Sequence, residues 1–207
     1  MVFDNVLEMA KSVSHFTIAG EGNVSVRDGD AMLIKASGST LETMTDDDLV
    51  RCDLDGNAFE GEEKKPSMEV SFHAWILKSF PEINCVCHTH PTNTIKILCS
   101  GRTHDFTNKR LFPDQVVRNG TKSCVVPYAT PGSPLREEIK KSVEEFIGRN
   151  GYFPKLILLK NHGIITASAS IQEATVSTLM CENLLRFILV LRYLTTYSFL
   201  LLKRLLL

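Results

Sequence analysis

Two apolar, strand-like stretches of this chain each end in histidine, and this feature constrains the fold more than any other. One stretch leads into His88-Thr89-His90, and the other leads into Asn161-His162-Gly163. Residues two apart on a strand point to the same face, so His88 and His90 are expected to aim their imidazoles at one place. Three histidines are one common way to hold a catalytic zinc ion while a position stays open for substrate. The spacing leaves open whether His162 meets the other two.

A plainer interpretation exists, because a His-x-His sequence is often only two polar residues on a strand. The chain has 6 histidines. The remaining three, His15, His73 and His104, show no comparable arrangement. Glu69 offers a carboxylate on a separate predicted helix, and together with the three histidines it favours a metal-assisted enzyme over a bare scaffold.

Composition limits the possible classes of function. With 207 residues, the chain is long enough for one domain with a sizeable core. Its formal net charge of -1 gives no electrostatic reason to expect binding to nucleic acid or to an anionic membrane. Six cysteines are scattered without C-x-x-C spacing, which argues against a disulfide framework. Cys85 and Cys87 alternate with His88 on the strand and are expected in the core. The segment 1–5 lacks the features of a secretory signal, so a cytoplasmic location is the default expectation.

The C-terminal end, residues 184–207, is very rich in leucine. Its longest stretch without a charged residue, Tyr193–Leu202, has 10 residues, whereas a spanning helix needs roughly 18 or more apolar residues. We therefore expect a helix that packs on the domain or on a neighbouring subunit. A helix on a membrane surface and a cloning or reading-frame artefact remain alternatives. One monomer could hardly cover this much apolar surface, which favours a homo-oligomer.

Hydrophobic periodicity predicts one α/β domain over residues 1–192, followed by a leucine-rich tail over residues 193–207. The sheet is expected to be mixed or antiparallel, with helices covering its faces, because regular β-α-β alternation is missing. Ser67 is a plausible N-cap for a helix that ends near Phe80. Predicted strands are 24–27, 31–35, 50–53, 85–89, 123–126 and 156–159. Predicted helices are 2–15, 66–80, 92–99, 135–149 and 171–193, with a further helix start near 45–48.

Over residues 5–190, the chain resembles the class II aldolase and adducin family. The resemblance is carried by six motifs that follow the family's order. They are Gly22-Asn23-Val24-Ser25-Val26-Arg27, Ser37-Gly38, Pro66-Ser67-Met68-Glu69, His88-Thr89-His90-Pro91, Pro127-Tyr128-Ala129-Thr130-Pro131-Gly132 and Asn161-His162-Gly163. Members of the family include aldolases for fuculose and rhamnulose phosphates, an epimerase, a dehydratase, decarboxylases and the non-catalytic adducin head.

This resemblance implies a three-layer α/β/α class II aldolase-like fold with a central mixed or antiparallel sheet, usually assembled as a tetramer with active sites between subunits. It implies that His88, His90 and His162 bind a divalent metal. Zinc suits imidazole ligands, while manganese, iron and cobalt stay open. It also implies that Glu69 is the catalytic acid/base.

The resemblance further implies that phosphate is held by four residues: Asn23, Ser37, Gly38 and Ser67. Backbone N–H groups near Gly22 and Gly38 and at the start of the predicted helix could serve an anion. Plain turn chemistry explains the two glycines equally well, and a structural Asx-turn would explain Asn23.

Two departures from the family concern substrate binding and proton donation. The sugar-phosphate aldolases often carry a second small hydroxyl residue where Met68 stands, and a methionine thioether cannot donate a hydrogen bond. Those aldolases also use a C-terminal tyrosine as proton donor. Tyr193 and Tyr197 lie in a tail that no longer resembles the family, and neither is assigned that role.

The interpretation we favour is a divalent-metal-dependent lyase, an aldolase that cleaves a hydroxylated carbonyl compound, expected to be a sugar phosphate, through a metal-stabilised enediolate. The alternative is a dehydratase, decarboxylase or epimerase of the same family that acts on a sugar-derived acid or phosphate. Glu69 argues against the epimerase, which resembles this family but uses aspartate there. A non-catalytic adducin-like interaction module should have lost the histidine ligands, and all three are present.

Overall fold

The structure is a computed structural model that describes residues 2–101, 103 and 110–205. Side chains are described for residues 6–101, 103, 110–188 and 190. A seven-stranded sheet in the order β3-β2-β1-β4-β7-β6-β5 forms the middle layer. Every neighbouring pair is antiparallel except β5 and β6, which are parallel. The sheet is therefore mixed, as the sequence predicts. The strands are β1 (Asn23–Asp28), β2 (Ala31–Lys35), β3 (Leu49–Asp53), β4 (Cys85–Thr89), β5 (Cys124–Val126), β6 (Leu156–Leu159) and β7 (Gly163–Ser168).

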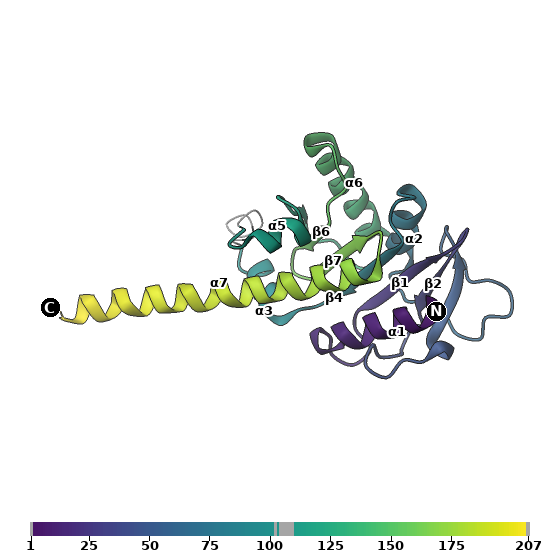
Figure 1. The fold of residues 1–207 in the computed structure, drawn as a ribbon, viewed down its shortest axis with the longest axis horizontal. Helices are drawn as coiled ribbons and strands as arrows, with labels where there is room; N and C mark the ends of the chain where they lie inside the picture. The colour runs from purple at the N-terminus through teal and green to yellow at the C-terminus, as the bar shows by residue number, and fades with distance from the viewer. Residues whose placement is uncertain (1, 102, 104–109, 206–207) are drawn as a thin grey trace.

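Helices cover both faces of this sheet (Figure 1). The α-helices are α1 (Val2–Val13), α2 (Val70–Ser79), α3 (Thr92–Leu98), α5 (Pro113–Asn119), α6 (Ser133–Asn150) and α7 (Ile171–Leu205). Two 3-10 turns, η1 (Ser14–Phe16) and η2 (Asp46–Asp48), are also present. On β6, Ile157 and Leu159 pack in a core with α2 and α6, whereas Leu156 and Leu158 pack with α3 and α7. This alternation confirms the predicted three-layer α/β/α fold.

The face that carries α1 and α7 also buries the two cysteines of β4. Cys85 and Cys87 lie in the core cluster beneath α1, while Val86 between them faces α2 and α6. The prediction that these cysteines alternate away from His88 into the core is confirmed. The cysteines of the described residues are free thiols.

Most predicted elements are present, with two omissions and one error. β7 and α5 were not predicted. Ser67 does not cap α2, because the helix begins at Val70 and Glu69 occupies the N-cap position. Here the backbone before the helix is tied to β2: the Ser67 N–H donates to the Lys35 carbonyl at 3.0 Å, and Pro66 forms a bridge with Ala36. A chain held in this extended pairing cannot begin its helix at Pro66.

The last helix, α7, is longer than predicted. It runs without interruption from Ile171 to Leu205, past the predicted end at Tyr193, and its C-terminal half extends away from the body of the molecule (Figure 1). The domain boundary expected after residue 192 thus falls inside a continuous helix. Among the described residues, no helix is both long and apolar enough to cross a membrane.

Candidate metal centre

The hairpin formed by β6 and β7 brings the third histidine to the other two. Leu159 pairs with Gly163 across a three-residue turn, in which Asn161 adopts a left-handed φ of 55°. Asparagine tolerates this conformation better than most residues. β7 then pairs with β4, with Ile164 opposite Thr89. His162 therefore lies beside the end of β4, where His88 and His90 are.

Gly163 permits this close approach. A Cβ atom at this position would stand 2.5 Å from the Thr89 carbonyl oxygen and 2.6 Å from Cδ2 of His90. Real Cβ atoms do not come this close, so any larger residue would push β7 away from His90. The glycine of the Asn-His-Gly motif therefore has a packing function beside the metal centre. Gly22, with φ of 70°, is similarly confined between the Thr17 side chain and the His88 carbonyl.

His88, His90 and His162 form one cluster, as the sequence predicts they must if they bind one ion. One ring nitrogen from each lies within 4.8 Å of the others, and this group is a candidate metal site. The side chain of His88 is fully buried, whereas the side chains of His90 and His162 are 17% and 14% exposed to solvent. The cluster is thus buried at His88 and accessible to solvent at His90 and His162.

Hydrogen bonds fix which nitrogen each of the two strand histidines presents. Nδ1 of His88 lies 2.8 Å from the Ile164 carbonyl oxygen, which can only accept, so Nδ1 carries the proton. Nδ1 of His90 lies 3.2 Å from a carboxylate oxygen of Glu21 and donates to it. Both rings therefore turn Nε2 toward the cluster. This outer support is typical of metal-binding histidines, and sequence reasoning missed Glu21.

The distance between these nitrogens suits a metal ion. Nε2 of His88 and Nε2 of His90 are 3.0 Å apart. In a tetrahedral zinc site with Zn–N bonds of about 2.0–2.1 Å, two ligand nitrogens lie about 3.3 Å apart. At this separation the two nitrogens can share a proton in a hydrogen bond or, when both rings are neutral at Nε2, a metal cation. The donor set therefore fits a divalent ion.

The electrostatics of the cluster are dominated by burial and by one carboxylate. Burial and the neighbouring His88 lower the pKa of His162 to about 4 and also lower the pKa of His90. Burial acts in the same direction on His88, but Glu69 outweighs it and raises the pKa of that ring. His90 and His162 are consequently neutral near pH 7, as metal ligands must be.

Glu69 reaches this cluster from the start of α2. One carboxylate oxygen, Oε2, accepts a hydrogen bond from Asn23 Nδ2 at 2.8 Å and lies 3.2 Å from His88 Nε2. The other, Oε1, lies 3.4 Å from His162 Nε2 and is buried without a hydrogen-bond partner among the described residues. Burial raises the pKa of Glu69, but His88 and Asn23 bring it below its ordinary value, so the group is ionised.

His73, which the sequence analysis set aside, lies directly behind this carboxylate. Its ring is fully buried, with Nδ1 2.7 Å from Ser25 Oγ and Nε2 hydrogen-bonded to Asn23 Oδ1. The sequence carries two local signals for these residues, although neither signal pairs the helix with the strand. Glu69 and His73 are four apart on one helix face, and Asn23 and Ser25 are two apart on one strand face.

The predicted phosphate-binding residues divide into two groups. Ser37 and Gly38 follow β2 and are exposed, and the Ser37 N–H donates to the Lys65 carbonyl at 2.8 Å. This places them beside the loop that holds the buried Ser67. Asn23 is buried on β1, with both ends of its amide already hydrogen-bonded. Met68 projects into solvent with 83% of its surface exposed.

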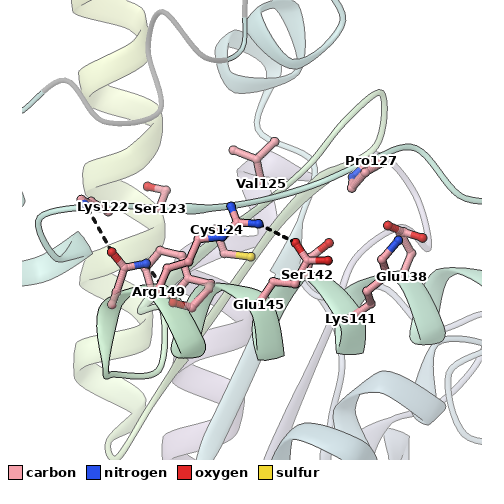
Figure 2. A pocket seen from close by; sticks show the side chains of 12 residues that line it. Lys122, Ser123, Cys124, Val125, Pro127, Glu138, Lys141, Ser142, Glu145 and Arg149 are labelled. Carbon is pink, nitrogen blue, oxygen red and sulfur yellow. Dashed lines mark hydrogen bonds and ion pairs between the residues drawn. The ribbon is translucent and has the colours of Figure 1, made fainter.

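A cavity of about 440 Å³ lies elsewhere, between β5 and α6 (Figure 2). Four of its charged or polar groups already form two pairs: Lys122 Nζ donates to Asn150 Oδ1 at 3.0 Å, and Arg149 pairs with Glu145 at 2.8 Å. None of the predicted site residues lines this cavity. The histidine cluster is therefore the stronger candidate for chemistry.

Comparison with known proteins agrees with this geometry. Residues 7–189 match the family described as Class II Aldolase and Adducin N-terminal domain. The chain is 30% identical to 3-oxo-tetronate 4-phosphate decarboxylase of Haemophilus influenzae, covering 79% of this chain and 74% of that protein. It is 34% identical to L-fuculose phosphate aldolase of the same organism, covering 84% of this chain and 73% of that protein.

A solved structure gives the same result for the fold. YgbL of Klebsiella pneumoniae, described with three alternative activities as an aldolase, epimerase or decarboxylase, superposes with a TM-score of 0.77 at 26% identity. The superposition covers 91% of this chain and 88% of YgbL.

Proposed function

The chain belongs to the class II aldolase and adducin family, and from this premise we propose that it is a divalent-metal-dependent lyase. The proposed reaction is an aldol cleavage of a hydroxylated carbonyl compound, a sugar phosphate in the favoured case. One observation carries the proposal: three imidazoles converge with the carboxylate of Glu69, and the side chains of His90, His162 and Glu69 stay partly exposed.

In this proposal His88, His90 and His162 hold the ion through ring nitrogens. Zinc suits three imidazoles best, and manganese, iron and cobalt remain open. A divalent ion held there supplies Lewis-acid stabilisation of the negative charge that develops on substrate oxygens. The hydrogen bonds from His88 to Ile164 and from His90 to Glu21 keep both rings in the orientation that this requires.

Glu69 is the proposed acid/base. Oε2 is held by Asn23, whereas Oε1 has no hydrogen-bond partner among the described residues and is the oxygen free to exchange a proton with a substrate carbon. A positioned general acid or base contributes roughly 100- to 10,000-fold to a rate. The family's second proton donor is not assigned here, and the side chains of Tyr193 and Tyr197 lie outside the described residues.

Substrate phosphate is proposed to bind where the loop after β2 meets the loop before α2. Ser37, Gly38 and Ser67 belong to these adjacent loops, and the hydroxyls of the two serines together with the Gly38 N–H suit an anion. The N–H groups of Ser37 and Ser67 already donate to the Lys65 and Lys35 carbonyls. Asn23 keeps one Nδ2 hydrogen for a ligand after its bond to Glu69. The thioether of Met68 adds no hydrogen-bond donor. Phosphate is therefore expected to bind more weakly here than at a site with a second hydroxyl residue.

Decarboxylation is the second candidate, because of the similarity to the Haemophilus influenzae decarboxylase. Loss of carbon dioxide from a 3-oxo acid and aldol cleavage both leave negative charge on a carbon next to a carbonyl group. An ion held by the same three histidines could stabilise either charge. Epimerase and dehydratase activities use related chemistry and stay as further alternatives.

Assembly and location are proposed from the family and from the sequence. A homotetramer and a small-molecule substrate follow from the family, and no nucleic-acid or membrane partner is expected from the charge of the chain. A cytoplasmic location and a separate role for residues 193–207 remain predictions from the sequence.

The deciding experiment offers the zinc-loaded protein two phosphorylated substrates in parallel. L-fuculose 1-phosphate is followed by release of dihydroxyacetone phosphate, and 3-oxo-tetronate 4-phosphate is followed by release of carbon dioxide. We expect turnover of the first, and turnover of the second alone would replace the aldolase by the decarboxylase.

Glu69→Gln is the matched variant in this assay, because it keeps the size of the side chain and removes its charge. It should keep the fold and the bound metal and slow turnover by roughly 100- to 10,000-fold. If Glu69 only stabilised the start of the helix, the variant would instead lose about 0.3–1 kcal/mol of stability and keep its turnover. Equal turnover in wild type and variant would leave the mechanism without its base.

A further inference from the structure

The buried polar residues behind Glu69 form one continuous chain of hydrogen bonds. Ser25 and Asn23 point from β1 to the same side as α2, and His73 lies between them. Asn23 then bonds to Glu69, whose carboxylate faces the histidine cluster. All four side chains are buried or nearly so, with His73 and Ser25 at 0% exposure.

The carboxylate determines the direction of every bond in this chain. An ionised carboxylate can only accept, so Asn23 must turn its Nδ2 toward Glu69 and its Oδ1 toward His73. The Asn23 oxygen also only accepts, and therefore Nε2 of His73 must carry the proton. Nδ1 of His73 is then an acceptor and receives the hydroxyl hydrogen of Ser25.

A neutral His73 is consistent with its surroundings. Burial, together with the neighbouring His88, lowers the pKa of His73 to about 3, so the ring is uncharged at neutral pH. The ring also stacks on Phe72, with centroids 4.6 Å apart, and Phe72 in turn meets His88 edge-on. His73 is thus held by both hydrogen bonds and packing.

We propose that His73 is a positioning residue: as the neutral Nε2–H tautomer, it locks the Asn23 amide in the one orientation that aims the Glu69 carboxylate at the histidine cluster. Without this donor, Oδ1 of Asn23 loses its partner and the amide can rotate. Glu69 then loses the bond that holds Oε2, and Oε1 leaves its place near His162. This inference rests on the proposed role of Glu69 in the reaction.

Kinetics of His73 variants test the proposal on whichever of the two substrates the wild type turns over. His73→Leu removes both ring nitrogens and should lower kcat roughly 10- to 100-fold, with metal content and KM close to wild type, because misplacement of a reacting group by about 1 Å has effects of this size. His73→Gln places an amide N–H near the position of Nε2 and should recover kcat to within about threefold of wild type.

Ile76→Ala is the matched control for general damage to α2. Ile76 is a fully buried core residue of the same helix and has no part in the hydrogen-bonded chain. It should reduce stability while leaving kcat of the folded fraction near wild type. An equal loss of kcat in Ile76→Ala and His73→Leu, or no recovery in His73→Gln, would overturn the positioning role.

A measurement on the wild type needs neither turnover nor a variant that folds. Nitrogen-15 NMR of the imidazole groups distinguishes the two neutral tautomers and the charged ring. We expect His73 to be the neutral Nε2–H form, in metal-free and zinc-loaded protein alike. A charged ring or an Nδ1–H tautomer would refute the inference directly. By contrast, absence of turnover in the wild type with both substrates would count against the proposed function. The tautomer of His73 would then be the result that decides the inference.

Discussion

At the scale of single residues, the missing side chain at position 163 lets two strands of the candidate metal centre approach each other. Gly163 lies where β7 passes closest to β4, and the absence of a side chain lets the Thr89 carbonyl and the His90 ring approach its Cα. His162 precedes it in the chain, so the same residue sets the position of two of the three ligands. The sequence motif is thus explained by sterics as well as by ligand chemistry.

Gly163→Ala should therefore impair metal binding. The added Cβ would stand 2.6 Å from His90 Cδ2 and 2.5 Å from the Thr89 oxygen, so the ring and the strand must move apart. We expect zinc affinity to fall roughly 10- to 100-fold, the range for loss of outer support at metal sites. Competition with a chromogenic chelator measures it. Gly148→Ala is the control, since a Cβ there meets nothing within 4 Å; equal affinities in the two variants would contradict the steric argument.

At the scale of elements, a buried carboxylate of α7 holds the start of α3. Glu182 accepts hydrogen bonds from the backbone N–H groups of Asn93 and Thr94, each at 3.0 Å, and from both of their side chains. These N–H groups belong to the first turn of α3 and have no partner within the helix. Because α3 follows His90 and Pro91 directly, this contact also anchors the chain on one side of the metal centre.

Glu182→Gln should destabilise the protein more than a surface charge change does. Its amide group would turn N–H toward donors that need an acceptor, and an unsatisfied buried donor costs about 1–3 kcal/mol. Urea denaturation of the two proteins measures the difference. The exposed Glu144 provides the comparison, and Glu144→Gln is expected to stay within about 0.5 kcal/mol of wild type. A similar midpoint for both variants would show that Glu182 contributes little.

At the scale of the whole molecule, the order of the strands assembles the centre. β7 enters the sheet between β4 and β6, although β4 and β7 are far apart in the sequence. β1 lies on the other side of β4 and sets Asn23 opposite His88. The clustered histidines, the carboxylate and its support therefore come from separate segments of the chain, and they meet only when β1, β4, β6 and β7 have paired.

Metal content tests this assembly. We expect one divalent ion per chain in protein purified under metal-replete conditions, and a large loss in His88→Ala, because removal of one of three ligands leaves an incomplete site. Elemental analysis measures both. His15→Ala is the comparison, since His15 is exposed and is not one of the clustered histidines. A wild type that binds no more metal than His88→Ala would refute the ligand assignment.

Self-association is the second prediction at this scale. α7 continues far beyond the sheet (Figure 1). Two apolar side chains of α7, Phe187 and Val190, are exposed by 46% and 52%. Val117 on the adjacent α5 is exposed by 60%. Light scattering at micromolar concentration should give a mass well above one chain, with a tetramer expected. Val190→Glu should lower this mass, and a clean monomer in the wild type would contradict the prediction.

Local sequence was sufficient for the features that repeat along the chain. The alternation of β4 placed His88 and His90 on one face and Cys85 and Cys87 on the other, and the structure agrees. Strand β4 was predicted with its observed ends. These features depend on side-chain periodicities of 2 and 3.6 residues, which a short segment carries by itself.

What the sequence by itself determined about this protein is therefore its layered α/β class, its family and the residue types of the candidate metal centre. The tertiary structure alone decided that β7 joins β4, that Glu69 precedes its helix, and that His73 supports Asn23. The physical reason is that strand pairing and buried hydrogen bonds select partners by fit across space. Asn23 and His73 are 50 positions apart, and no local periodicity relates residues at such a separation.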